Sequence, residues 1–490
     1  MPIYFCGCID RKIRKDCFLL AQVSWRKSEW GRYRIGARMH KIERLELGLD
    51  FFKCGVSQKR SDLWTIFIWL LLTAVSQGQR VENTTLQVPL ELNELPQLLS
   101  ETGIFQDLET LTPESGILPY EPILAFWSDN AIKSRWVYIP FEDQVGFSEE
   151  RSWSFPTGSI WVKHFDLELE RGNPESRKKI ETRLLVKTSF GVHGVSYQWN
   201  DEESEATLVG DDAVSLTYDI LDNGEARQQA WEIPSRNDCL ACHTTVGGMA
   251  LSFNTRQLNH EIDVEGQSRN FIKYLSDVGV LDTEINTPEI LPRYSKAGDS
   301  GYSIDHQARS YLAVNCAYCH SPGGPIESDP FDARPFRALD RTGLLDETTN
   351  LAYDNPLVEL LSRGSNELSA LWLNMAGTGG VGRMPPLATF ERDEEGEALI
   401  ASWINDVLPG YLTFDKWREQ NFVDPNSPEA SRSFDADGDG DSNELEFIGR
   451  TDPNDSSDHS RIEVKREGDG LELVYAVAPF AEYQLKRAKT

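Results

Sequence analysis

Two copies of the motif Cys-x-x-Cys-His constrain this chain more than any other feature. They read CLACH at 239–243 and CAYCH at 316–320. Cysteines three apart in a helical turn share a face, so both thiols can form thioethers with the vinyl groups of one haem, and the next histidine can bind its iron. Composition would produce on the order of 10⁻³ such motifs by chance. The sequence therefore predicts two covalently bound c-type haems.

Each predicted haem has three attachment residues. They are Cys239, Cys242 and His243 for the first haem, and Cys316, Cys319 and His320 for the second. Two other interpretations of these cysteines stay open. A redox disulfide would explain Cys-x-x-Cys but not the histidine, and a four-cysteine zinc site would need pairs much farther apart in sequence than those of a usual zinc ribbon.

Each haem iron has a sixth position, on the face opposite the motif histidine. Met384 lies in the loop sequence GRMPPLA and can present a thioether to the second haem. For the first haem we favour His164, in the strand-like sequence WVKHFDLEL, over Met249, which follows His243 too closely to wrap round a ring. Other candidates stay open: His193, His260, His306, Met375 or an unfilled position.

A second ligand pattern lies in the acidic sequence FDADGDGDSNELEF. Positions 1, 3, 5, 7, 9 and 12 of a twelve-residue loop are Asp435, Asp437, Asp439, Asp441, Asn443 and Glu446. Oxygen ligands at this spacing, with Gly440 at the sharp turn, are what Ca²⁺ requires. Asp452 and Asp455 are further candidates for a second or shared ion. The alternative is an acidic linker that binds no metal.

Residues 1–76 differ in character from the rest of the chain. They hold Cys6, Cys8, Cys17 and Cys54, show no clear periodicity, and end with the apolar run 63–75 preceded by basic residues. That run has the length of a signal-peptide core, so we interpret residues 1–76 as a leader outside the fold. The protein is then exported to the periplasm or secreted. A retained N-terminal membrane anchor is the alternative.

The formal net charge of the chain is −29. An acidic surface repels the phosphate backbone of nucleic acids, so nucleic-acid binding is excluded. Basic protein partners and cations remain compatible with this charge.

Several short sequences in order resemble a family of exported bacterial di-haem c-type cytochromes. They include LSETGIF, PYEPILAFWSD, FPTGSIWVKHF, NDCLACHT, ARSYLAVNCAYCHSPGG and MPPLA, and the likeness covers about residues 95–410. Members are often encoded beside, or fused to, PQQ-type sugar dehydrogenases, and the resemblance implies covalent haem and electron transfer. The acidic loop separately resembles thrombospondin-type-3-like and EF-hand-like calcium loops, although Arg450 stands where that pattern usually has glycine.

These patterns predict an α+β multidomain chain. Alternating β-branched and aromatic runs indicate a β-rich domain over 77–235, whereas helical spacing and Gly/Pro-rich loops over 236–412 favour two all-α cytochrome c-like modules. The expected order after the leader is a β-rich domain at 77–235, haem modules at 236–300 and 301–412, a linker at 413–433, a calcium loop at 434–458 and a β-hairpin at 459–490.

Three functional hypotheses follow. The first is a di-haem cytochrome that carries electrons between periplasmic redox partners, such as a dehydrogenase and an oxidase. The second is a peroxidase-like or oxidase-like haem enzyme in which the first iron keeps an open position. The third is a calcium-dependent secreted scaffold protein. Both Cys-x-x-Cys-His motifs are evidence against this third hypothesis.

Overall fold

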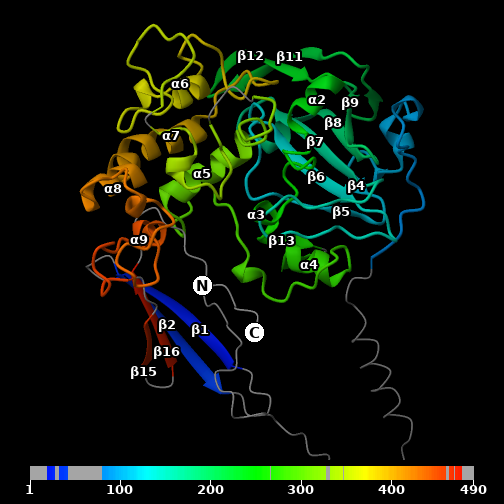
Figure 1. The fold of residues 1–490 in the computed structure, drawn as a ribbon. Helices are drawn as coiled ribbons and strands as arrows, with labels where there is room; N and C mark the ends of the chain where they lie inside the picture. The colour runs from blue at the N-terminus through cyan, green and yellow to red at the C-terminus, as the bar shows by residue number, and fades with distance from the viewer. Residues whose placement is uncertain are drawn as a thin grey trace, which may run out of the picture. The chain divides into compact units, whose positions relative to one another are not determined.

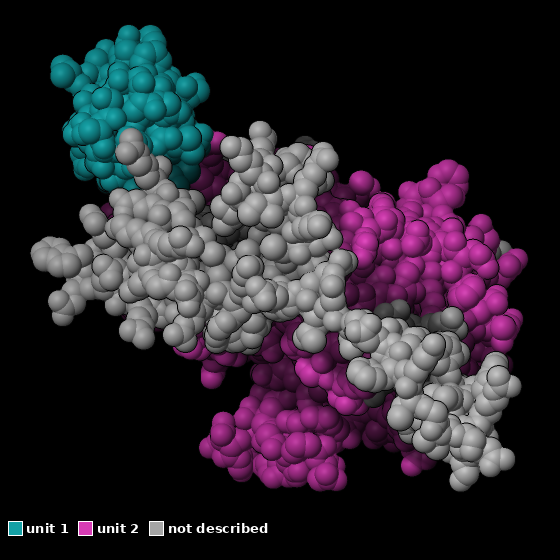
Figure 2. Space-filling view, turned by 90° about the horizontal axis from the view of Figure 1, so that it is seen from below, with its two compact units in different colours: residues 1–72, 411–490 teal, residues 73–410 magenta. Residues whose placement is uncertain are grey.

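The computed structural model describes residues 80–264, 266–326, 331–345 and 347–459, together with the backbone of four strands nearer the two ends of the chain. It divides into two compact units, which Figure 2 colours separately. One unit is Thr73–Gly410, and the other combines Met1–Leu72 with Tyr411–Thr490. The apolar run 63–75, expected to be a signal peptide, lies outside the described residues.

The larger unit is built on a six-stranded antiparallel sheet with strand order β10-β9-β8-β7-β6-β5 (Figure 1). The strands are β5 (Ile117–Pro119), β6 (Ile132–Tyr138), β7 (Ile160–Glu168), β8 (Arg177–Lys187), β9 (Val192–Trp199) and β10 (Ala206–Leu208). Because side chains alternate between the faces of a strand, β7 divides its residues between two environments. Ile160 and Val162 enter one apolar cluster, and Trp161 enters another on the opposite face.

Three two-stranded sheets complete the β structure of this unit. They are β3 (Phe105–Asp107) with β4 (Thr112–Pro113), β11 (Val214–Asp222) with β12 (Glu225–Ile233), and β13 (Glu261–Val264) with β14 (Gln267–Asn270). The β11–β12 hairpin turns at Asn223 and Gly224, which both have positive φ, as a tight two-residue turn requires. Except for β13 and β14, all these strands fall within the segment where we expected a β-rich domain.

The α-helices of this unit are short. They are α2 (Arg236–Cys242), α3 (Thr255–Leu258), α4 (Phe271–Asp277), α5 (Ile304–Asn315), α6 (Ala370–Ala376) and α7 (Glu394–Ser402). A π-helical turn, η7 (Trp403–Val407), continues α7. Single 3-10 turns are η1 (Leu92–Glu94), η2 (Leu99–Thr102), η3 (Pro174–Ser176), η4 (Pro288–Ile290), η5 (Leu339–Arg341), η6 (Asn366–Leu368) and η8 (Leu408–Gly410).

The prediction of two all-α modules over 236–412 is wrong. The first region contains the β13–β14 hairpin, and its apolar side chains do not form a helical core of their own. Phe253, Phe271 and Leu275 pack instead into one cluster with Trp161 and Leu185 of the large sheet. Helical spacing in the sequence predicted which side of each helix is buried, but it did not predict that this side packs against the large sheet.

The second region departs from an all-α module for a different reason. Between α5 and α6 the described residues form no α-helix, and isolated bridges join Leu345 to Leu361 and Glu359 to Ser369. Glycine and proline interrupt this stretch often enough that loop structure replaces helix. The larger unit is therefore a β-rich body that carries short helices.

The smaller unit contains α8 (Phe414–Asn421), η9 (Pro428–Ala430) and α9 (Asn443–Gly449), held by an aromatic cluster of Phe414, Trp417 and Phe447. Its sheet has the order β1-β2-β16-β15, with β1 (Leu19–Lys27), β2 (Arg32–Lys41), β15 (Glu463–Glu467) and β16 (Gly470–Ala476). The pair β15–β16 lies where we expected a hairpin. Strands β1 and β2, however, lie in the segment that we interpreted as outside the fold.

No helix among the described residues is both long and apolar enough to cross a lipid bilayer.

Candidate functional site

The first Cys-x-x-Cys-His motif forms helix α2 and its C-terminal cap. The helix begins after Ser235, whose hydroxyl accepts a hydrogen bond from the amide of Asp238, while the Asp238 carboxylate accepts one from the amide of Ser235. This capping box fixes the start of a helix only seven residues long. Cys239 and Cys242 consequently lie about one turn apart on one face, as attachment to a single ring requires.

His243 is oriented as an iron ligand would be. Its Nδ1 lies 2.5 Å from the carbonyl oxygen of Met249, so Nδ1 must donate and Nε2 keeps a lone pair. Burial is the main cause that lowers the pKa of His243 to about 4, which leaves the imidazole neutral. A neutral imidazole held by a second hydrogen bond is the form that binds metals. Because its carbonyl contacts His243, Met249 would lie on the same side of a bound haem as that histidine.

A cavity of about 180 Å³ adjoins the first motif. Cys239, Cys242 and His243 line it together with Trp161 and Trp231. Helix α2 packs beside β9, as Figure 1 shows, and brings Cys239 over Gly194 of that strand. The wall on the sheet side also carries three cationic side chains, from Arg135, Lys163 and Arg183.

The structure does not place His164 in this cavity. Its ring is fully buried on the other face of β7, where Nδ1 lies 2.8 Å from the hydroxyl of Thr182 and Nε2 lies 3.0 Å from the carboxylate of Asp166. Strand alternation turns the preceding residue, Lys163, toward the motif instead.

The remaining candidates for the first distal position also lie elsewhere. His193 and His260 contact the carbonyl oxygens of Leu90 and Glu121. His306 stacks on Tyr302. Among the residues that the structure describes, His243 is the only histidine lining the first cavity, and no methionine lines it.

The second motif follows helix α5. Cys316 caps the helix, its amide donating to the carbonyl of Leu312, and the amide of His320 donates to the carbonyl of Cys316 over 2.8 Å. A largely apolar cavity of about 310 Å³ adjoins this motif, in the size range of small-molecule sites. Cys316, Cys319 and His320 line it.

Two methionines line the second cavity, Met384 and Met375. Met384 was expected there, and its amide donates to the carbonyl of Asn374 over 3.0 Å. Met375, buried in α6, was a sequence candidate for the first haem only. It lies 55 residues after His320 in the sequence, so its position gave no signal that it would reach the second cavity.

The two cavities adjoin one another. Phe126, Cys242, Tyr318 and Leu387 line both of them. The Cys242 and Cys319 thiols are neighbours between the motifs, and their interaction is the main cause that lowers the pKa of Cys319 and raises that of Cys242. Spacing along the sequence gave no indication that the two motifs meet.

In each motif, a glycine five residues after the second cysteine packs against the backbone of that cysteine. A Cβ atom on Gly247 would lie 2.6 Å from the carbonyl oxygen of Cys242, and one on Gly324 would lie 2.4 Å from that of Cys319. Backbone approaches of this closeness admit only glycine. The two motifs thus share a local chain path, although their surroundings differ.

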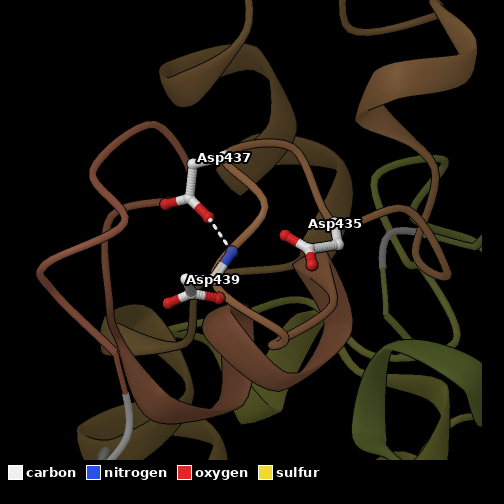
Figure 3. A group of neighbouring side chains, drawn as sticks. All are labelled: Asp435, Asp437 and Asp439. Atoms are coloured by element: carbon white, nitrogen blue, oxygen red, sulfur yellow. Dashed lines mark hydrogen bonds between the residues drawn. The ribbon is translucent and has the colours of Figure 1, made fainter.

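The cysteines do not form the zinc site that we left open. Among the described residues, only Asp435, Asp437 and Asp439 bring three potential ligand atoms of His, Cys, Asp or Glu within 4.8 Å of one another. Figure 3 shows these three aspartates around the interior of one loop. The residues at each haem motif instead fit a haem: a thiol pair, an adjacent histidine and an enclosed cavity.

The acidic loop has the geometry of a cation site. The carboxylate of Asp435 accepts hydrogen bonds from the amides of Gly438 and Gly440, at 2.8 and 3.0 Å, and Gly440 has a φ of +101°. The amide of Asp439 donates to Asp437, and that of Asp441 donates to Asp439. These bonds turn the chain so that successive carboxylates face inward.

Buried oxygens in this loop lack protein partners. Asn443 and Glu446 are fully buried, and within the described chain Asn443 Oδ1, both carboxylate oxygens of Glu446 and Asp437 Oδ2 have no hydrogen-bond donor. Burial first, and then the neighbouring aspartates, raise the pKa of Glu446 to about 7. Converging oxygens without donors fit Ca²⁺.

We compared the chain with protein-family models, curated proteins and solved structures, and none matched.

Proposed function

We propose that this chain is an exported di-haem c-type cytochrome that carries electrons between redox partner proteins. The observation that supports it most is that each Cys-x-x-Cys-His motif opens onto its own cavity and that the two cavities share a wall. Haems attached at these motifs would be close neighbours. A periplasmic dehydrogenase and an oxidase are the classes of partner that such a carrier would serve.

The residues have separate roles in this proposal. Cys239 and Cys242 would attach the first haem, and Cys316 and Cys319 the second. His243 and His320 would bind the iron, whose change of oxidation state supplies the electron-transfer chemistry. The carbonyl of Met249 holds the first imidazole in place, and Met384 offers a thioether to the second iron.

A haem enzyme is the second candidate, favoured by the contents of the first cavity. No methionine and no second histidine from the described residues lines it. An iron bound there only by His243 would keep a position open for peroxide or another small substrate. The second site would then pass electrons to or from the first.

Calcium is proposed as a further cofactor, bound in the smaller unit. Asp435, Asp437, Asp439, Asp441, Asn443 and Glu446 are the proposed ligands. Buried oxygens without donors support this assignment more strongly than the acidic composition does, because exposed acidic groups need no metal. The ion would stabilise the turn before α9.

Intact-mass spectrometry of the exported protein tests the haem assignment. We expect a mass increment for two haems, and Cys242→Ala and Cys319→Ala should each impair one attachment site. Asp201→Asn, at an exposed side chain, is the control and should keep both haems. A wild-type mass without haem would contradict the proposal, and a loss of two hydrogens would instead indicate a disulfide.

The sixth ligand of the second iron is tested by Met384→Ala and Met375→Ala. We expect Met384→Ala to convert the second haem from low spin to high spin in EPR spectra and Met375→Ala to leave it low spin. The reverse result would assign the thioether to Met375. The same spectra distinguish the two functional candidates, because an open first iron gives a high-spin signal in the unaltered protein.

A further inference from the structure

Three cationic side chains form a row across the large sheet. Arg135 on β6 pairs in register with Lys163 on β7, and Lys163 pairs with Arg183 on β8. Directly opposed residues in antiparallel strands project from the same face, so the three side chains are neighbours. All three line the cavity of the first motif.

Only one of these three cations has a direct ion pair among the described residues. Arg183 forms a two-pronged ion pair with Glu181, at 2.6 and 2.9 Å, and Glu181 also accepts a hydrogen bond from the indole of Trp231. Among the described residues, no carboxylate forms an ion pair with Arg135 or Lys163. Among the described residues one carboxylate, that of Glu181, thus forms an ion pair with the row, although Glu232 and Asp238 also line the cavity and Glu121 lies near Arg135.

Such an arrangement is unfavourable unless an anion completes it. Opposed like charges destabilise a sheet, and a buried charge without a partner is costly. Arg135 is only 7% exposed, and Lys163 is half-buried and lines the cavity. Burial and the neighbouring cations lower the pKa of Lys163 well below its ordinary value, which is the expected consequence of a missing counter-charge.

We propose that Arg135, Lys163 and Arg183 form a carboxylate-binding site in the first cavity. A guanidinium fork matches the two oxygens of a carboxylate, and an ammonium group adds a point charge beside it. Two sources carry this chemistry: the propionate groups of a haem attached at Cys239 and Cys242, or a small free dicarboxylate. The first source rests on the proposed function, and the second does not.

The test uses Arg135→Gln and Lys163→Met, with Arg135→Lys as the conservative variant and Lys178→Gln as the control. Lys178 lies on the same strand as Arg183 but pairs with Asp201. Mass spectrometry first counts the haems. Redox potentiometry then measures the midpoint potential of each haem, and succinate serves as the probe for free carboxylates in calorimetric titrations.

The two sources give different results. If the row binds propionates, Arg135→Gln and Lys163→Met lower the first midpoint potential. The reason is that nearby positive charge stabilises the reduced haem, so its loss disfavours reduction. Arg135→Lys keeps the charge and should largely restore the potential. If the row binds free carboxylates, the unaltered protein binds succinate saturably, and each charge-removing variant weakens that binding at least tenfold. The control changes neither quantity.

The proposal is overturned if both charge-removing variants match the unaltered protein in first midpoint potential and if none of the proteins binds succinate. A chain without haem would contradict the proposed function alone, because succinate titration of that chain still decides whether the row binds carboxylates. Circular dichroism of every variant confirms that it is folded before these comparisons are made.

Discussion

Gly194 is the point at which strand β9 passes closest to the first motif. A Cβ atom there would lie 2.7 Å from Sγ of Cys239 and 3.0 Å from its Cβ. The φ angle of Gly194 is not in the left-handed region, so the requirement for glycine comes from this contact alone. The strand thereby leaves room for the Cys239 side chain.

We expect Gly194→Ala to displace Cys239 and to reduce haem attachment at the first motif. Overpacking of this kind lowers the free energy of unfolding by about 1–3 kcal/mol. Intact mass reports attachment, and chemical denaturation reports stability. Gly191→Ala is the matched control, because a Cβ atom there would meet nothing within 4 Å. Equal haem content in the two variants would show that the contact does not matter.

At the first motif the sequence predicted which residues lie together, but not which other side chains line the cavity beside them. Cys239, Cys242 and His243 lie together because their spacing acts within one helical turn. For strand β7 the sequence showed alternation but not which face carried the cavity. The sequence therefore favoured His164 as a ligand, whereas the structure places its neighbour Lys163 in the lining of the cavity.

The loop that carries Met384 is anchored by the β-rich part of its unit. The buried carboxylate of Asp129 accepts hydrogen bonds from the amides of Phe390 and Glu391, at 2.9 to 3.0 Å. The indole of Trp127 donates to the carbonyl of Glu391. The end of the loop that follows Met384 is thus fixed by contacts between residues that are more than 250 positions apart in the sequence.

We expect Asp129→Asn to loosen this loop, because an amide has one acceptor oxygen and opposes the backbone donors with its own N–H groups. Loss of hydrogen bonds to a charged acceptor costs about 1.5–3 kcal/mol each. Trypsin should cut faster after Arg383 or Arg392, which bracket the loop. Asp201→Asn is the control, and unchanged cleavage in Asp129→Asn would contradict the anchoring role.

At the scale of elements, the sequence indicated strands better than modules. The alternation in WVKHFDLEL and ETRLLVKTSF corresponds to β7 and β8, which share one mostly buried face that includes Val162 and Leu184. Helical spacing after residue 236 corresponds to short helices such as α4, whose apolar residues Phe271 and Leu275 pack on the sheet. Spacing within an element does not reveal its packing partner, so the all-α modules were predicted wrongly.

At the scale of the molecule, the division into two units separates the two candidate sites. Both haem motifs belong to Thr73–Gly410, and the acidic loop belongs to the unit that contains Tyr411–Thr490. The grouping of the acidic side chains in the loop was predictable from the sequence, because they lie within twelve positions. The neighbouring cavities were not predictable, because they depend on contacts between α2, the chain after α5 and the sheet.

We expect Ca²⁺ to stabilise the smaller unit by binding its folded loop. Saturation at one hundred times the dissociation constant contributes about 2.7 kcal/mol, which should raise the unfolding temperature of that unit in calorimetry. Glu446→Gln and Asp437→Asn should remove most of this gain. Glu419→Gln, outside the loop, is the control and should keep it.

The same gain should depend on pH. Without the ion, the pKa of Glu446 is raised to about 7, so the ion-free loop is most stable below the ordinary carboxyl range and loses stability as pH rises through 7. Bound Ca²⁺ needs the carboxylate form, and its stabilising effect should therefore grow from pH 5 to pH 8. A calcium effect that is equal at both pH values, or equal in Glu446→Gln, would contradict the assignment of Glu446 as a ligand.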